Sequence, residues 1–97
     1  MYYLEENCPV CDEGLLGFLR CSDGENIVIM CEECNSVWLT PDEVGKQNPI
    51  YPEAPDFLLP DTTSISISGG DSGWASLEEI KLARMGNYAS EKRRYEP

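Results

Sequence analysis

The chain has 97 residues, of which 18 are acidic, seven are lysine or arginine and none is histidine, and its net charge at pH 7 is −11. A chain of this length is expected to form one domain with a thin core. Direct binding to DNA or RNA is not expected, because it depends on lysine and arginine side chains that neutralise phosphates. Histidine is the commonest general base, so its absence also argues against an enzyme, and we expect no catalytic residues.

The first residues, Met1–Glu6, have neither the basic start nor the apolar stretch of a secretory signal. We therefore expect a cytoplasmic protein with reduced cysteines and no contact with a membrane.

Short strands and turns are predicted for the first forty residues. Residues 2–4 and 14–21 are predicted to be strands. The turn-forming sequence at 22–26 leads into the apolar and mostly β-branched run at 27–30, and residues 27–39 are predicted to form a hairpin.

Two short helices are predicted from their capping signals. Thr40, Pro41 and Glu43 fit an N-cap, a first helical position and the end of a capping box. Ser76 and Glu79 form a second capping box, at the start of a C-terminal helix. The apolar face of that helix consists of Leu77, Ile80 and Ala83.

Residues 41–63 are predicted to form an extended proline-rich arm, because the five prolines between 41 and 60 exclude a long helix or a central strand. The arm also carries apolar residues, and we expect it to pack along the first forty residues. Serine and isoleucine alternate at 64–68, which predicts a half-buried strand. Residues 64–86 are therefore assigned as a strand and a helix of the same domain, and residues 87–97 as a loose tail.

Aromatic side chains and one unpaired cysteine are predicted to fill the core. Cys21 is interpreted as a small buried hydrophobe. Tyr88 and Tyr95 are excepted because they belong to the predicted tail. The aromatic residues assigned to the core are Tyr2, Tyr3, Phe18, Trp38, Tyr51, Phe57 and Trp74.

Four cysteines form two C-x-x-C pairs, Cys8 with Cys11 and Cys31 with Cys34, separated by nineteen residues. Two such turns can supply the four soft ligands of a tetrahedral metal, and Zn²⁺ is the expected ion, although iron binds similar thiolate sites. The closed shell indicates a structural site. Disulfides and a thioredoxin-type redox pair are less favoured, because no export signal and no βαβ pattern accompany the pairs.

Residues 8–39 resemble a zinc ribbon, in which two cysteine turns, called knuckles, clamp a small antiparallel sheet. In that family a glycine usually follows each second cysteine, because the backbone there has a positive φ. Asp12 and Asn35 stand at these positions, and both residue types tolerate that conformation. The resemblance implies a metal-stabilised antiparallel sheet, assigned as a zinc ribbon over residues 1–40. Together with the proline-rich arm, the extra short strand and the one C-terminal helix predicted above, it makes the expected fold a small metal-stabilised α+β domain. It implies no single function, because zinc ribbons serve in transcription, translation, enzymes and protein contacts.

The acidic residues are concentrated in the first four fifths of the chain. Residues 1–79 contain sixteen acids against Arg20 and Lys46, whereas residues 80–97 contain two acids against five basic residues. So large an acidic excess favours a basic protein partner, attracted over distances of the order of the Debye length.

Four acidic residues near the second knuckle are the predicted partner-binding side chains: Glu32, Glu33, Asp42 and Glu43. The first hypothesis is a protein that covers a basic surface, as an immunity protein or antitoxin covers the substrate channel of a nuclease toxin. The whole chain also resembles small stand-alone bacterial zinc-ribbon proteins. The second hypothesis is a regulatory or structural subunit of a larger complex. The third is a rubredoxin-like electron carrier with iron in the four-cysteine site, since acidic carriers dock onto basic reductases.

Overall fold

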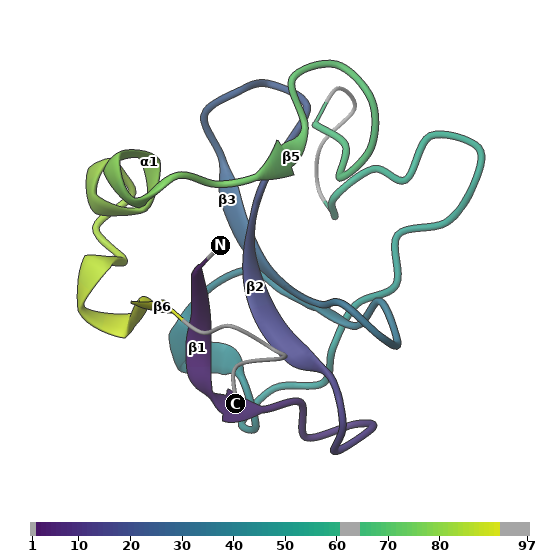
Figure 1. Cartoon of the computed structure of the whole chain (residues 1–97). Coiled ribbons are helices and arrows are strands. Elements are labelled where there is room, and N and C mark those ends of the chain that lie inside the picture. Colours follow the sequence, from purple (N-terminus) through teal and green to yellow (C-terminus); the bar gives the residue numbers. More distant parts are fainter. Residues whose placement is uncertain (1, 61–64, 92–97) are drawn as a thin grey trace.

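A central antiparallel sheet organises the computed structural model of the chain, which describes residues 2–60 and 65–91 (Figure 1). Its two inner strands are β2, Leu15–Arg20, and β3, Ile27–Cys31, and they pair over their full shared length. The turn between them closes with the Asp23 carboxylate, which accepts hydrogen bonds from the backbone N–H groups of Glu25 and Asn26. The residues predicted as strands therefore form the centre of the sheet.

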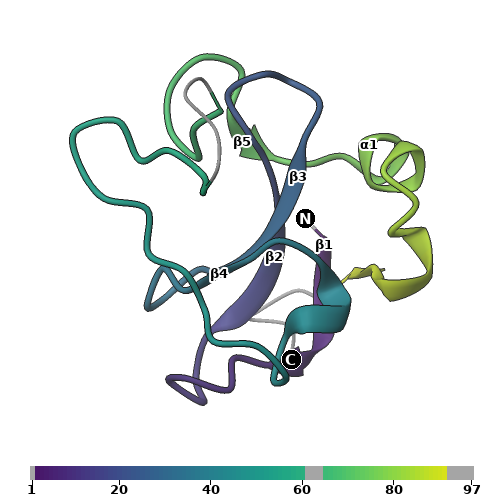
Figure 2. The same ribbon diagram turned by 180° about the vertical axis from the view of Figure 1, so that it is seen from behind.

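The remaining strands lie on both sides of this pair (Figure 2). β4, Val37–Trp38, pairs with β3; β1, Tyr2–Asn7, pairs with β2; and β6, Ser90–Glu91, pairs with β1, so that the order is β4-β3-β2-β1-β6. β5, Gly73–Trp74, pairs with the far end of β2, past the last residue that β1 reaches. β2 thus has β3 along one edge and β1 followed by β5 along the other.

Three short helical segments complete the described residues: η1, Pro41–Glu43; α1, Leu77–Leu82; and η2, Gly86–Tyr88. Within residues 2–60 and 65–91, the helices are too short and too polar to cross a lipid bilayer. The described part of the chain is a small antiparallel sheet with one α-helix and a cluster of four cysteines, as expected for a small α+β domain.

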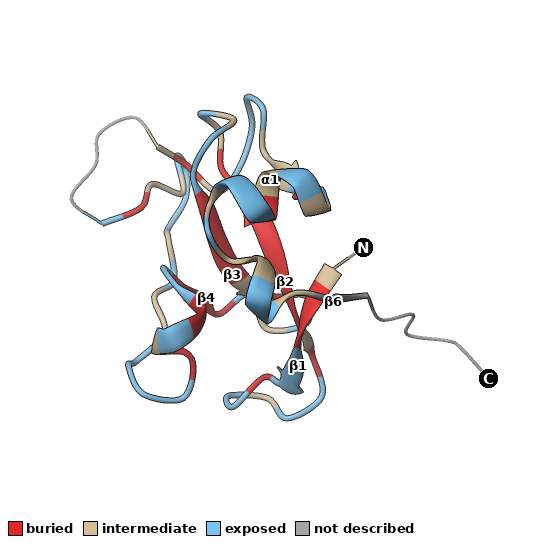
Figure 3. Cartoon of the chain, turned by 90° about the vertical axis from the view of Figure 1, so that its left-hand side faces the viewer, coloured by how far each residue is buried: buried red, intermediate tan, exposed pale blue. Residues whose placement is uncertain are grey.

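Both faces of the sheet are buried, which explains why the run at 27–30 is continuously apolar. Alternate residues of β2 and β3 point to opposite faces, and the two inner strands are buried along most of their length (Figure 3). The first face is covered by α1 and by the turn after η1. Its buried residues are Leu4, Cys8, Leu16, Phe18, Ile27, Ile29, Cys31, Trp38, Val44, Ala75 and Ile80.

The second face is covered by the arm and by the segment that follows it. Its buried residues are Leu19, Cys21, Val28, Val37 and Leu59. Ile50, Ile65 and Ile67 pack against them from the arm side. Ile50 is also fixed by two backbone hydrogen bonds with Val37, of 3.0 and 2.8 Å. The described part of the arm is therefore attached to the sheet by apolar contacts and by main-chain pairing.

The two predicted capping signals both make hydrogen bonds. Ser76 Oγ accepts from the Glu79 N–H at 3.2 Å, and the Glu79 carboxylate accepts from the Ser76 N–H at 2.9 Å. The Glu43 carboxylate accepts from both the N–H and the hydroxyl group of Thr40, at 3.0 and 3.2 Å. The C-terminal helix is confirmed, but α1 ends at Leu82 rather than near 86, and Arg84 has a φ of 63°.

The predicted strand at 64–68 is wrong in its extent. Ser66 makes one isolated antiparallel bridge with Leu58, and Ser64 lies outside the described residues. Ser66 is the buried residue of this segment, whereas Ile65 and Ile67 are half-buried, and the Ser66 hydroxyl group donates to the Asp56 carbonyl at 2.5 Å. Its N–H donates to Ser22 Oγ at 2.9 Å. These hydrogen bonds hold the segment between the arm and the turn at Ser22. In this position it does not continue as a regular β-strand.

The predicted loose tail also differs from the structure. Residues 87–88 belong to η2 and residues 90–91 form β6, which pairs with Tyr2 and Tyr3 of β1. Edge pairing needs only main-chain groups, so it leaves no apolar pattern in the sequence. Residues 61–63 of the predicted arm and residues 92–97, with Tyr95, lie outside the described residues.

The aromatic residues assigned to the core differ in burial. Tyr3, Phe18 and Trp38 are buried, and Tyr2 and Phe57 are half-buried. The prediction is wrong for the remaining pair, which are substantially exposed: Tyr51 at 53% and Trp74 at 36%. The ring of Trp74 lies against the backbone of Gly17, where an added Cβ would meet the ring at 2.5 Å. The absence of a side chain at Gly17 lets the Trp74 ring pack against the backbone of β2, but the ring stays partly exposed.

Candidate metal centre

The four predicted cysteine ligands come together at one end of the sheet, where their sulfur atoms all lie within 4.8 Å of one another. Cys8 and Cys34 sulfurs are 3.7 Å apart, and Cys11 and Cys31 sulfurs are 3.6 Å apart. A regular tetrahedron with metal–sulfur bonds of about 2.3 Å has sulfur–sulfur separations of about 3.8 Å. The group can therefore hold one metal ion and is consistent with a zinc-ribbon-like site.

The first knuckle directs two sulfurs through its backbone. The Asp12 N–H donates to the Cys8 carbonyl at 2.9 Å and closes the turn. The N–H groups of Val10 and Gly14 point at the Cys8 and Cys11 sulfurs, each at 3.4 Å. Asp12 has a φ of 61°, which confirms the conformation expected after the second cysteine.

The second knuckle repeats this arrangement. The Asn35 N–H donates to the Cys31 carbonyl at 3.2 Å, and Asn35 has a φ of 63°. The N–H groups of Glu33 and Cys34 point at the Cys31 sulfur, at 3.4 and 3.5 Å. Backbone donors aimed at sulfur stabilise thiolate charge, so both knuckles favour metal-bound sulfur.

Two residues that support the centre were not predicted from the sequence. A Cβ at Gly14 would lie 2.2 Å from the Cys31 sulfur, so only glycine fits where the two knuckles meet. Ser36 is fully buried, and its Oγ lies 3.1 Å from the Cys34 sulfur and 2.8 Å from the Tyr51 hydroxyl oxygen. The only sequence signal for Ser36 is its position two residues after a ligand, which is too general to identify it.

The thiols of the metal centre differ in burial and in pKa. Cys8 and Cys31 are fully buried, and desolvation raises the pKa of both, that of Cys31 to about 12. Burial also opposes ionisation of Cys34, but hydrogen bonds, first from Ser36 and then from the other cysteines, lower its pKa to about 7. The buried thiols of Cys8 and Cys31 therefore need a bound cation to ionise at neutral pH.

Four protein sulfurs fill a tetrahedral shell and leave no position for a substrate, so the expected role of the metal is structural. All five cysteines are free thiols. The fifth, Cys21, is fully buried among the apolar residues of the second face, as predicted, and lies outside the four-sulfur group. Burial and then the Asp23 carboxylate raise its pKa to about 11, as for an unreactive thiol.

The predicted partner-binding acids occupy different environments. Glu33 is exposed and Glu32 half-buried, both on the second knuckle. Asp42 is exposed, and its carboxylate accepts from the Tyr88 hydroxyl group at 2.6 Å. Glu43 is half-buried and holds Thr40. Asp42 and Glu43 therefore each make a contact that also supports the fold.

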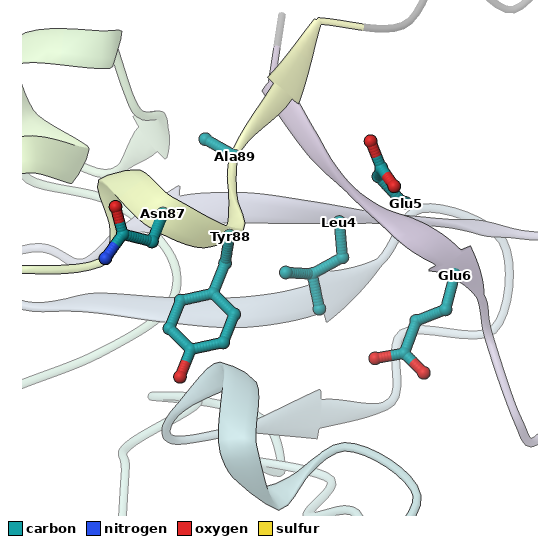
Figure 4. A pocket seen from close by; sticks show the side chains of 6 residues that line it. All are labelled: Leu4, Glu5, Glu6, Asn87, Tyr88 and Ala89. Carbon is teal, nitrogen blue, oxygen red and sulfur yellow. The ribbon is translucent and has the colours of Figure 1, made fainter.

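A hollow of about 400 Å³ opens between β1 and η2 (Figure 4). Its lining residues are Leu4, Glu5, Glu6, Asn87, Tyr88 and Ala89. Tyr88, which forms part of the wall, is the residue that donates to Asp42. Sequence reasoning missed this hollow because the residues on its η2 side were assigned to a loose tail.

Comparisons of the chain with protein-family models, with curated proteins and with solved structures gave no match.

Proposed function

We propose that the chain is a Zn²⁺ protein that binds a basic protein partner through its metal-bearing end and blocks the basic surface that it covers. An immunity protein or antitoxin that neutralises a nuclease-type toxin is the form of this proposal that we favour. The metal holds the shape of the binding face, and the carboxylates supply the attraction.

The observation that carries the proposal is the distribution of charge around the metal centre. Four adjacent acidic pairs belong to the strand, knuckles and helical turn at this end: Glu5–Glu6, Asp12–Glu13, Glu32–Glu33 and Asp42–Glu43. Lys46 is the only basic residue that follows them closely in the chain. In Figure 1 these segments lie in the lower part of the molecule, whereas α1 lies in the upper part.

The basic residues of the upper part do not offset this charge. Arg20, at the far end of β2, makes an ion pair with Glu79 at 2.8 Å. Lys81 and Arg84 lie within or just after α1. Among residues 2–60 and 65–91, the lower end therefore presents carboxylates to an approaching partner, and a field of this kind accelerates association with a basic surface.

The hollow beside β1 gives this acidic surface a concave site that a side chain of the partner can enter. Glu5 and Glu6 lie on its strand side and the Tyr88 ring on the other (Figure 4). Carboxylates and an aromatic ring are the groups that receive a lysine or arginine side chain. We therefore place the anchoring contact of the partner in this hollow, with Glu32 and Glu33 steering its approach.

Metal analysis tests the first part of the proposal. The protein purified without added metal is expected to contain one Zn²⁺ and to be colourless. A coloured iron protein would instead favour the rubredoxin-like electron carrier, and a metal-free folded protein would contradict the proposed site.

A matched pair of double variants tests the second part. The probe is the protein that co-purifies with the tagged chain at low salt, after it has been identified and purified separately. E32Q/E33Q is expected to slow its association by about threefold or more, because steering depends on charge near the contact. E53Q/D56N removes the same charge from the arm and is expected to change the rate less.

Three results would contradict the partner proposal: an acidic co-purifying protein, an association rate that does not depend on salt, or equal effects of the two double variants. Co-purification of a large assembly, without inhibition of any member, would favour the regulatory or structural subunit.

A further inference from the structure

The second knuckle and the arm are joined by a chain of hydrogen bonds that starts at a metal ligand. Ser36 is fully buried, with its Oγ 3.1 Å from the Cys34 sulfur. The same oxygen lies 2.8 Å from the hydroxyl oxygen of Tyr51, fifteen residues further along the chain. We propose that Ser36 and Tyr51 are positioning residues of the metal centre, and that a bound metal fixes the arm at Tyr51 through them.

A bound metal determines the direction of both hydrogen bonds. A metal-bound cysteine is a thiolate, which has no proton and can only accept. The single hydroxyl hydrogen of Ser36 must then point at the Cys34 sulfur, and its oxygen is left to accept from the Tyr51 O–H. Each donor polarises the next along such a chain, and the bond to the charged sulfur is the strongest.

The Tyr51 hydroxyl group donates to Ser36 and so holds the Ser36 hydroxyl group in the direction of the Cys34 sulfur, as an outer-shell partner orients a ligand. Tyr51 therefore strengthens metal binding through Ser36, and by linkage a bound metal strengthens the attachment of Tyr51 by the same factor.

Tyr51 depends on this bond because little else encloses its side chain. The residue is 53% exposed, although Ile50 beside it is fixed to Val37 by two backbone hydrogen bonds. The loop that follows, residues 52–56, is half-buried at Pro52 and exposed elsewhere. The hydroxyl group thus anchors the arm directly after Ile50, which pairs with Val37 of β4.

The orientation of Tyr51 also shapes the surface beside the knuckle. Tyr51, Met30, Pro52 and Phe57 line a hollow of about 320 Å³ that reaches Asn35. A metal that holds Tyr51 in place therefore maintains one wall of this hollow. The inference rests on the metal part of the proposed function and is independent of the partner.

Zinc affinity, measured by competition with a chromophoric chelator, tests the chain of bonds. S36A is expected to weaken Zn²⁺ binding by about tenfold, as for the loss of an outer-shell partner, and Y51F by about threefold. The double variant S36A/Y51F should bind no more weakly than S36A, because Tyr51 acts on the sulfur only through Ser36. The control is Y88F, which removes a tyrosine hydroxyl group bonded to Asp42 instead.

Amide exchange in the zinc-loaded proteins gives a second measurement that needs no metal-free state. The Phe57 N–H, which donates to the Glu53 carbonyl at 2.8 Å, should exchange faster in Y51F than in the wild type or Y88F. Wild-type zinc affinity in Y51F, or additive losses in the double variant, would overturn the inference. A wild type that binds no zinc would instead overturn the metal proposal itself.

Discussion

Asp12 and Asn35 show how single residues determine the geometry of the metal centre. Each follows the second cysteine of a pair and has a φ near 60°, so that its N–H turns back to the carbonyl of the first cysteine. A residue with a Cβ in this region costs roughly 1–2 kcal/mol, and asparagine and aspartate reduce the cost by local hydrogen bonding. The sequence predicts these conformations because the residue types and their spacing from the cysteines are both local.

At Asn35, a glycine variant should therefore be more stable than an alanine variant, which is the reverse of the order expected at positions with a negative φ. N35A is expected to lose about 1 kcal/mol of unfolding free energy, and N35G to stay within about 0.5 kcal/mol of the wild type. Asn48, which has no positive φ, is the control, and there alanine should be more stable than glycine. The measurement is denaturant unfolding at fixed free zinc. Equal stability of N35A and N35G would contradict the account.

At the scale of elements, local signals predicted the inner strands β2 and β3 and the starts of η1 and α1, and long-range contacts decided the rest. β3 and the capping box of α1 follow from apolar runs and from residues three positions apart. Ser66 does not, because its burial depends on Ser22 and Asp56, which lie far from it in the sequence. Tyr51 was assigned to the core by its type alone, whereas its hydroxyl group reaches Ser36 and keeps its ring at the surface.

The attachment of α1 to the sheet also combines a local and a distant contact. The Glu79 carboxylate accepts from the Ser76 N–H within the capping box and from Arg20 of β2, at 2.8 and 3.0 Å. Arg20 also donates to the Asp71 carbonyl at 2.6 Å, before β5. The cap was predictable from the sequence, whereas the ion pair was not, because Arg20 is 59 residues away.

Removal of the Glu79 charge should destabilise the protein independently of pH over the neutral range. Hydrogen bonding to Ser76 and then the Arg20 pair lower the pKa of Glu79 below its ordinary 4.5. Its stabilising effect is therefore complete above that value and is lost only as the pH falls through the lowered folded value. E79Q should cost about 0.5–1 kcal/mol, equally at pH 6 and pH 8.

Two further variants separate the contributions of Glu79 in the same unfolding measurement. E78Q, on the same helical turn but exposed, should change stability by less than about 0.5 kcal/mol. E79A should cost more than E79Q, by about 0.5–1 kcal/mol, because it also removes the cap acceptor. If E78Q and E79Q are equally destabilised, the contact with Arg20 contributes nothing.

At the scale of the whole molecule, the cysteines connect the metal centre to the apolar core. Cys8 and Cys31 are fully buried members of the cluster on the first face, together with Phe18 and Ile29. Structural zinc contributes about 10–16 kcal/mol in small zinc domains, which is as large as the whole stability of a typical domain, about 5–15 kcal/mol. An acidic chain with a thin core is therefore expected to depend on its metal for folding.

Removal of the metal by a strong chelator at pH 7 should abolish cooperative unfolding, because the buried thiols would face one another without a cation in the core. C31S should have the same effect without chelator, whereas C21S, which alters an equally buried cysteine outside the site, should keep Zn²⁺ and lose only about 1–3 kcal/mol. Circular dichroism and bound zinc report the two outcomes.

A thiol reagent should react with all five cysteines after chelation, but Cys21 should not react in the zinc-loaded protein, where it is fully buried. Native-like spectra and a cooperative transition in the metal-free wild type would show that the core folds without the four-sulfur site.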